Sequence, residues 1–328
     1  MKGDYIQQME VETILARNIS VVGDKAAYDA ACKRLLANKI ILAWIMTSCL
    51  EEYRGIEVNE IAEKYIEGEP QIAKAAVNPD EGSDHDNEQI QGTKNEDSTI
   101  NEGTVTFDIR FYAILPKSKE TVRLIINVEA QNDFYPGYPV IKRGIYYCSR
   151  MISSQYGVEF TDAHYEKIKK VYSIWVCAAP PKYRQNTITR YVVSEENLVG
   201  MVQEKKEDYD LFTAVMICLG HSDGDNYGGI LKLLDVLLSS EKEPEEKKRI
   251  LQDDFDIRMT KKLEREVFDV CNLSKGVEEK GITIGIERGT LQAIKNLMDT
   301  LKMTAEQAMT ALKVPENERF KYASRLNE

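Results

Sequence analysis

Apolar residues recur at helical spacing in the first part of the chain. Between residues 26 and 52 they fall three and four positions apart with few helix breakers among them, which predicts one long, partly buried helix. A shorter helix is expected over residues 58–66, because glycine and proline follow it closely. The next segment, residues 71–77, is compatible with either a strand or a loop.

The middle of the chain changes to the alternating pattern of strands. Residues 104–115 and 121–131 are rich in Val, Ile, Thr, Phe and Tyr, and the polar turn "PKSKE" joins them. We therefore expect a β-hairpin. An amphipathic helix is predicted over residues 139–156. The apolar run 171–179 has the length of a buried central strand that ends before Pro180.

Beyond residue 209 the pattern predicts helices. The apolar segments "LFTAVMICL" and "GGILKLLDVLLSS" precede a charged stretch, and no second β-domain is expected. Further along, three glycines recur at four-residue spacing: Gly281, Gly285 and Gly289. This spacing is compatible with a helix face that another helix approaches closely, and equally with a flexible linker.

Two short helices are expected at the end of the chain, one from Thr304 and one from Pro315. Thr304 and Gln307 have the spacing of a capping box, and proline suits a first helical turn. A helical hairpin is the common form of such a pair, and a DNA-reading helix-turn-helix is the rarer alternative.

These patterns divide the chain into three parts. An α/β core is predicted over residues 1–200, a helical extension over 201–270 and a glycine-punctuated helical tail over 271–328. Within the core, residues 78–103 contain no aromatic or large apolar cluster. This acidic segment cannot offset the entropy of ordering, so a disordered insertion is expected there.

The net charge of -11 initially argues against a nucleic-acid partner. Residues 78–102, however, hold eight acidic residues against Lys94, a local charge of -7, which leaves -4 for the rest of the chain. A basic patch on one face of the core therefore stays compatible with the composition, because the field at a site depends on local charges more than on the total.

Composition also limits the compartment and the kind of metal site. The chain begins with a polar segment and has no uninterrupted apolar run of roughly 18 residues, so neither a signal peptide nor a membrane span is expected and the cytoplasm is the default location. Six scattered cysteines without CxxC spacing are expected to be reduced core residues. With three distant histidines, any metal would be held by oxygen ligands.

Two carboxylates interrupt the apolar hairpin, Asp108 and Glu129. A buried carboxylate on a strand is costly unless it is paired or binds a metal. The turn lies midway between the two acids, so their side chains can converge at one end of the sheet. With the backbone carbonyl of Ala130 and waters, they would form a site suited to magnesium or manganese. Alternatively, the acids face solvent or pair with Arg110 or Arg123 across the hairpin.

The order of these elements resembles the PD-(D/E)XK nuclease superfamily, and in particular its recombination-promoting nuclease and transposase branch. The resemblance rests on "FDIRFYAI", "INVEAQND" and "YPVIKRGIYYCSRMISSQ", covers about residues 26–179, and extends to the tail "CNLSKGVEEKGITIGIERG". It implies a restriction-endonuclease-like core, a mixed central sheet flanked by helices, in a bacterial cytoplasmic protein. It also implies divalent-metal-dependent cleavage of DNA in transposition or recombination.

The resemblance implies a role for each matching residue. Asp108 and Glu129 would hold Mg²⁺ or Mn²⁺, and Gln131 would occupy the position of the superfamily's lysine, although an amide is neither a cation nor a base. Glu52 is a possible third acid, with Glu51 nearly as plausible. The missing positive charge would come from the following helix, for which the candidates are Lys142, Arg143 and Arg150.

The implied mechanism is metal-assisted hydrolysis of a phosphodiester bond. Gln131 would hydrogen-bond the attacking water or a phosphate oxygen, and Arg143 or Arg150 would contact phosphate. The competing interpretation is a nuclease fold that has lost its chemistry and binds nucleic acid or a protein partner. The helical tail is a candidate region for self-association.

Overall fold

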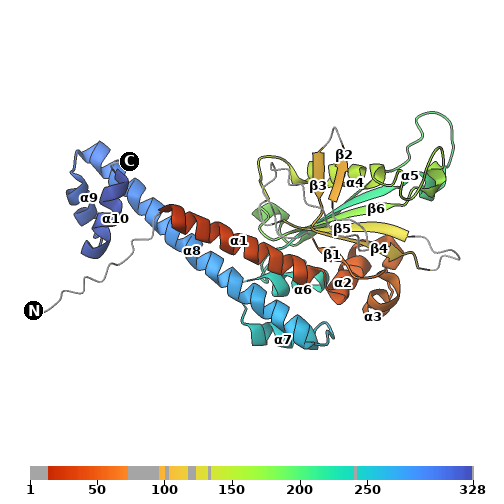
Figure 1. Cartoon of the computed structure of the whole chain (residues 1–328), viewed down its shortest axis with the longest axis horizontal. Helices are drawn as coiled ribbons and strands as arrows, with labels where there is room; N and C mark the ends of the chain where they lie inside the picture. Colours follow the sequence, from red (N-terminus) through yellow and green to blue (C-terminus); the bar gives the residue numbers. More distant parts are fainter. Residues whose placement is uncertain are drawn as a thin grey trace, which may run out of the picture. The chain divides into compact units, whose positions relative to one another are not determined.

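The computed structural model describes residues 14–72, 96–99, 103–116, 123–131, 134–239 and 242–326. The chain forms two compact units, one of residues 26–272 and one of residues 1–25 together with 273–328 (Figure 1). Within the described part of the chain, no helix combines the length and apolar character needed to cross a membrane.

The larger unit is built on one mixed six-stranded sheet. Its strands are β1 (Gln71–Ile72), β4 (Ile109–Ile114), β5 (Arg123–Gln131), β6 (Val171–Cys177), β7 (Thr187–Val192) and β8 (Phe212–Cys218). They lie in the order β1-β4-β5-β6-β8-β7. Strands β5, β6 and β8 are parallel to one another, whereas β1, β4 and β7 pair antiparallel with their neighbours. The predicted α/β class with a mixed sheet is confirmed.

The predicted hairpin is present, because β4 pairs antiparallel with β5. Its first strand is shorter than expected: β3 (Gly103–Thr106) ends two residues before β4 begins and pairs with β2 (Glu96–Thr99) in a separate two-stranded sheet. Part of the predicted disordered insertion is therefore strand. The rest of it, residues 78–95 and 100–102, and the turn residues 117–120 lie outside the described residues.

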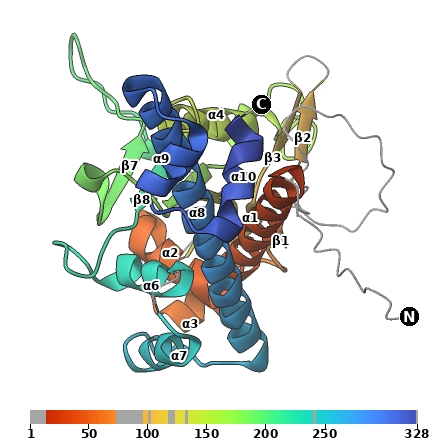
Figure 2. The same cartoon turned by 90° about the vertical axis from the view of Figure 1, so that its left-hand side faces the viewer.

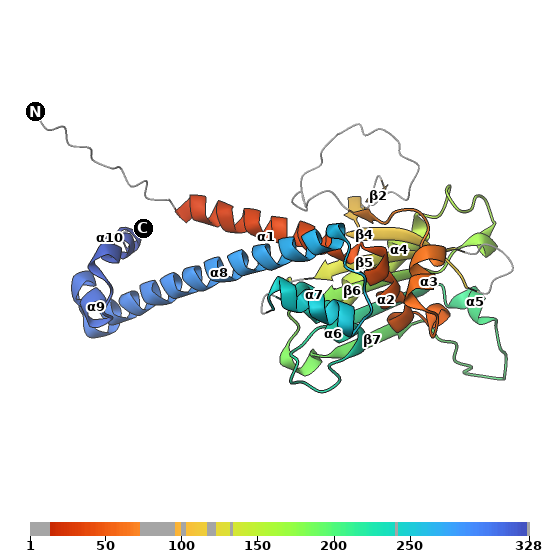
Figure 3. The ribbon, with the colours of Figure 1, turned by 90° about the horizontal axis from the view of Figure 1, so that it is seen from below.

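Helices cover both faces of the sheet (Figure 1). On one face α4 (Val140–Ser153) packs its buried side on a core that includes Trp175 and Met216. On the other face lie α2 (Lys39–Cys49) and α6 (Gly229–Leu238), which are in front of the strands in Figure 3. Both faces of β6 are thus buried, as its continuous apolar sequence predicts.

Two predictions about elements are corrected. The single helix over residues 26–52 is two helices, α1 (Ile14–Leu36) and α2, because Asn38 caps the second by accepting a hydrogen bond from the N–H of Ile40. Residues 212–218, predicted as helix, form β8 at the heart of the sheet, so 201–270 is not a purely helical extension. A short apolar run has no period that separates a buried strand from a buried helix. Strand β7 was not predicted.

The other helical segments between residues 50 and 254 are short. They are the 3₁₀ turn Glu51–Tyr53, α3 (Val58–Glu60) with the π turn Ile61–Tyr65, the 3₁₀ turns Tyr165–Lys167 and Lys182–Arg184, α5 (Lys206–Tyr209) and α7 (Pro244–Asp253). The predicted helices over 58–66 and 139–156 are therefore confirmed, with small changes at their ends.

The C-terminal part of the chain is helical, as predicted. Helix α8 (Lys261–Leu301) runs without a break through the three spaced glycines, so the flexible-linker alternative is wrong. It is followed by α9 (Ala305–Ala311), whose capping box between Thr304 and Gln307 is present, and by α10 (Glu316–Leu326). Both lie against the end of α8 (Figure 2), around a small core that includes Ile294 and Tyr322.

Gly144 provides a test of how closely α4 packs on the sheet. A Cβ atom at this position would stand 3.0 Å from Nε1 of the fully buried Trp175. We expect Gly144→Val to lower the free energy of unfolding by about 1–3 kcal/mol, because the core must shift to admit the side chain. Denaturant unfolding followed by tryptophan fluorescence measures this loss.

Gly285 is the matched control for this substitution. It lies inside α8, and a Cβ there would meet nothing within 4 Å. We expect Gly285→Ala to leave stability unchanged or to raise it by up to about 1 kcal/mol, because alanine costs less backbone entropy in a helix. A stable Gly144→Val variant beside a destabilised Gly285→Ala variant would contradict both expectations. Circular dichroism reports the unfolding of α8.

Candidate functional site

The two hairpin carboxylates meet at one end of β4 and β5. Asp108 lies in the break before β4, and Glu129 lies near the end of β5. The N–H of Asp108 donates to Oε1 of Glu129 over 3.0 Å, and the N–H of Ala130 donates to Oδ2 of Asp108 over 3.0 Å. Each carboxylate thus accepts a backbone hydrogen bond beside the other, which fixes both acids where they converge, as the spacing predicted.

A lysine from α1 neutralises part of this charge. Nζ of Lys33 lies 2.8 Å from Oδ1 of Asp108 and 2.6 Å from Oδ2 of Asp29, one helical turn earlier. The side chain of Lys33 is 8% exposed and that of Asp108 15% exposed. Asp108 therefore pairs with a cation from the first helix.

The protonation of this pair follows from burial and neighbouring charge. Burial raises the pKa of Asp108, while the charge of Lys33 and the N–H of Ala130 favour its ionised form. Burial also works against the charge of Lys33, but Asp108 and Asp29 outweigh it and raise the pKa of Lys33 above its ordinary value. Lys33 therefore keeps its proton at neutral pH.

A second cation approaches from α4 on the side of Glu129. Arg143 donates from Nε (3.0 Å) and Nη2 (2.6 Å) to the hydroxyl of Tyr147, and from Nη1 (3.2 Å) to the hydroxyl of Tyr138. Its guanidinium also lies over the ring of Trp175, 5.4 Å from the centroid. Burial opposes the charge, yet Tyr147 and Glu129 outweigh it, so the pKa of Arg143 is raised. Arg143, one of the three predicted cations, is therefore within reach of the charge of Glu129.

Gln131 and Ala130 take different positions on β5. Glu129 is in register with Trp175, and Gln131 with Cys177, both of which belong to the core beneath α4. Since side chains alternate along a strand, Gln131 faces the same side as Glu129. Ala130 contributes its N–H to Asp108, whereas the prediction concerned its carbonyl.

The predicted third acid lies elsewhere. Glu52 accepts hydrogen bonds from the hydroxyl of Tyr172 and from Nζ of Lys170 at 3.3 Å. Tyr172 is in register with Ile126, three positions before Glu129, which places it about 10 Å away along the strand and on the opposite face. The alternative, Glu51, pairs with Arg190 and with Lys206 (2.8 Å), which lower its pKa to about 2. Neither joins the hairpin acids.

The other two predicted cations take different positions on α4. Lys142 is exposed on α4. Arg150 is 2% exposed, lies about two turns beyond Arg143, and its Nη1 is 3.4 Å from the hydroxyl of Tyr146. The cluster thus consists of Asp108 and Glu129 with Lys33 and Asp29 on one side and Arg143 on the other.

The residues of this cluster meet only part of what a Mg²⁺ or Mn²⁺ site requires. Asp108 and Glu129 offer oxygen ligands, and magnesium commonly takes one or two protein carboxylates. Among the described residues, however, no three of His, Cys, Asp and Glu come close enough to hold a metal ion together. The ammonium of Lys33 already lies against Asp108, so a metal ion there would have to replace it.

Sequence reasoning missed Asp29 and Lys33. A signal was present, because the two residues stand four positions apart in a helix, and Lys33 shares its helix face with the apolar residues Ala30, Leu36 and Ala37. A lysine on the buried face of a helix needs a buried partner. The sequence pattern does not identify that partner, because the contact between Lys33 and Asp108 depends on tertiary packing.

Comparison of the chain with protein-family models, with curated proteins and with solved structures found no match.

Proposed function

We propose that this chain is a divalent-metal-dependent DNA endonuclease with a restriction-endonuclease-like core, associated with transposition or recombination. The observation that carries the proposal is the acid pair itself: two carboxylates buried at the end of a hairpin, with a lysine and an arginine on either side of them. Buried acids are costly, and such clusters are commoner at functional sites than elsewhere. The resemblance in the motifs around Asp108 and Glu129 supports the same conclusion.

In this proposal Asp108 and Glu129, with the carbonyl of Ala130, hold Mg²⁺ or Mn²⁺. The bound ion would lower the pKa of a water and offset charge on the phosphorus. Arg143 contacts a phosphate oxygen with a guanidinium that stays charged at every physiological pH. Gln131, on the same face of β5 as Glu129, donates an amide hydrogen bond to the water or the phosphate. Lys33, whose Nζ lies 2.8 Å from Oδ1 of Asp108, would then be available to contact the phosphate.

A second candidate function is a nuclease fold without chemistry, used to bind nucleic acid or a protein. The Lys33 ammonium against Asp108 favours this candidate, because it neutralises an acid without any metal. So does Gln131, which cannot carry the charge of the superfamily's lysine. The two candidates differ in one measurable property, since a binding module needs neither metal nor both acids.

The test is cleavage of supercoiled plasmid by the full chain in Mg²⁺, in Mn²⁺ and in chelator. We expect nicking in one or both metals and none in chelator. The control is the Lys33→Met/Asp108→Asn variant purified in the same way: it removes both charges of a buried pair together, keeps the shape of Asp108, and should stay folded but inactive. Equal nicking by this control reveals a contaminating enzyme. A folded wild type that cuts in neither metal overturns the proposal.

A further inference from the structure

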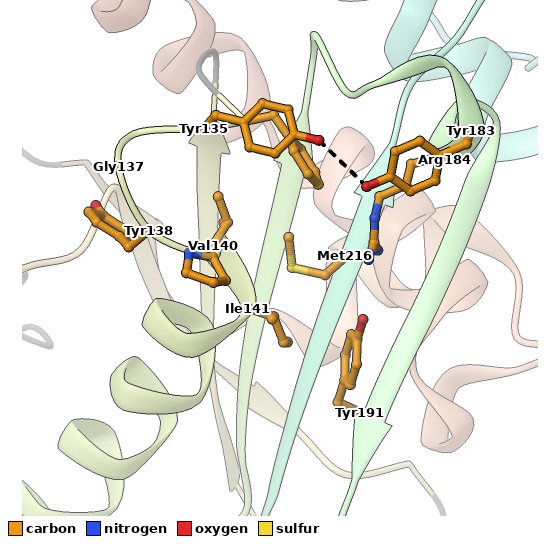
Figure 4. A pocket seen from close by; sticks show the side chains of 11 residues that line it. Tyr135, Gly137, Tyr138, Val140, Ile141, Tyr183, Arg184, Tyr191 and Met216 are labelled. Carbon is orange, nitrogen blue, oxygen red and sulfur yellow. Dashed lines mark hydrogen bonds between the residues drawn. The ribbon is translucent and has the colours of Figure 1, made fainter.

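A cavity of about 400 Å³ lies between the start of α4, the segments that follow β5 and β6, and strand β8 (Figure 4). Its size falls within the range of roughly 300–1,000 Å³ that is usual for small-ligand sites. Tyr135 and Tyr183 point toward each other across it, from the segments that follow β5 and β6, and their hydroxyl oxygens are 3.5 Å apart. Met216 on β8 and Ile141 at the start of α4 also line it.

The rings that line this cavity are unusually accessible. Tyr135 is 65% exposed and Tyr183 is 74% exposed. The segment that carries Tyr135 is stiffened by Pro136 and Pro139 and turns at Gly137, whose φ of 92° favours glycine. Exposed aromatic rings held on a rigid loop lose little conformational entropy when a flat ligand packs on them.

The charge of the cavity selects the kind of ligand. The guanidinium of Arg184 lies over the rings of Phe134 and Tyr183, 5.8 and 5.7 Å from their centroids. The Nε of Arg184 is buried and has no hydrogen-bond partner in the described structure. Among the described residues that line the cavity, none is acidic. This lining disfavours a cationic guest and favours a flat, electron-rich group joined to an anion.

The cavity is linked to Arg143 through a hydrogen bond of one of its lining residues. Tyr138 lines it, and the hydroxyl of Tyr138 accepts a hydrogen bond from Arg143, the guanidinium that also acts on Glu129. A ligand in the cavity would therefore place an attached phosphate near Arg143. A cavity next to Arg143 fits a nucleotide whose base lies in the cavity and whose phosphate contacts Arg143.

We propose that this cavity binds an unpaired nucleobase of a nucleic-acid strand, by stacking on Tyr135 and Tyr183 beside the phosphate contact of Arg143. A base inside a duplex cannot reach these rings, so the substrate class is single-stranded or locally unpaired nucleic acid. The inference rests on the proposed function for the phosphate at the acid pair, but the stacking itself requires no cleavage.

The test measures binding of a fluorescein-labelled oligothymidine to the full chain in chelator, followed by anisotropy. Aromatic stacking is worth about 1–3 kcal/mol per base, so we expect Tyr135→Ala/Tyr183→Ala to weaken binding by about 5- to 150-fold. Tyr135→Phe/Tyr183→Phe should bind as the wild type does, because stacking needs the ring and not the hydroxyl. A duplex of the same length should bind more weakly to the wild type and lose less in the alanine variant.

Tyr165 supplies the matched control. It is also 65% exposed, but it precedes β6, whereas Tyr183 follows the other end of that strand. Tyr165→Ala should leave binding unchanged. Equal affinity of wild type and Tyr135→Ala/Tyr183→Ala for the single strand overturns the inference, as does an equal loss in Tyr165→Ala.

A second probe separates this inference from the proposed function. An oligonucleotide with one 2-aminopurine should lose fluorescence on binding to the wild type, and keep it with the alanine variant, because stacking quenches the base. If quenching requires the two tyrosines and the protein cuts no plasmid, base binding in the cavity is supported and the proposed nuclease activity is refuted. Metal-dependent cutting without such quenching refutes the cavity and leaves the nuclease.

Discussion

Glu129→Gln is expected to slow metal-dependent plasmid nicking by at least about a thousandfold, if the acid pair holds the catalytic ion. The substitution keeps the shape of the side chain and an oxygen that can accept the N–H of Asp108, now 3.0 Å from Oε1. It removes one of the two negative charges that attract the ion. The loss should therefore appear in the rate and in Mn²⁺ affinity, with little change in the denaturation midpoint.

Glu159→Gln is the matched control for this loss. Glu159 is half-buried in the same unit, accepts a hydrogen bond from the hydroxyl of Tyr112 at 2.6 Å, and pairs with Lys169. We expect this variant to cut plasmid at the rate of the wild type. Nicking by Glu129→Gln at an undiminished rate would place the chemistry away from the hairpin. Binding of oligonucleotide in chelator should survive in both variants, which shows that the protein is intact.

The hairpin and its acids could be predicted because the responsible signals are local. Alternation marks the strands, and a central turn brings Asp108 and Glu129 to the same end. Strand β8 could not be recognised in the same way, since it is buried on both faces and shows no alternation. Its partners, β6 and β7, are set by tertiary pairing across the sheet.

The third acid was misplaced, and Lys33 was missed, for a related reason. Glu52 was the candidate third acid because it stands at the end of the single helix predicted over residues 26–52. The helix instead ends at Leu36, and the cap at Asn38 starts a new one. The end of α1 therefore brings Lys33 to Asp108, while Glu52 follows α2 to the opposite face of the sheet. The break between α1 and α2 at residues 37 and 38 therefore determines that Lys33, and not Glu52, contacts the hairpin acids.

Lys33→Met is expected to lower the free energy of unfolding by about 3–5 kcal/mol, because it leaves a buried charge without a partner. The side chain of Lys33 is 8% exposed and contacts both Asp108 and Asp29. Without its positive charge, the negative charges of these two carboxylates repel each other. Asp108→Asn should cost a similar amount. The Lys33→Met/Asp108→Asn variant should recover much of the loss, which a double-mutant cycle measures as coupling between the two side chains. If the losses in unfolding free energy of the two single variants simply add in the double variant, the contact between Lys33 and Asp108 contributes little to stability.

The pH dependence of this deficit identifies the charge responsible for it. The pKa of Lys33 is raised in the folded chain, since Asp108 and Asp29 outweigh its burial. Its stabilising contribution is therefore complete below its unfolded pKa of about 10.4 and is lost only as pH rises through the higher folded pKa. The deficit of Lys33→Met should shrink in strong alkali, and it should also shrink as pH falls, because burial raises the pKa of Asp108 and the loss of the Lys33 charge raises it further.

Manganese should reduce the same deficit. In Lys33→Met the Asp108 carboxylate has lost its ammonium, so a divalent ion no longer competes with Lys33 for Oδ1. Binding to the folded state alone adds stability by mass action, and we expect Mn²⁺ to raise the unfolding midpoint of Lys33→Met more than that of the wild type. Lys33→Met/Asp108→Asn, which lacks the ligand, should not respond. Equal responses of all three proteins would mean that the ion binds away from Asp108, and Lys33 would then be a structural partner of that acid only.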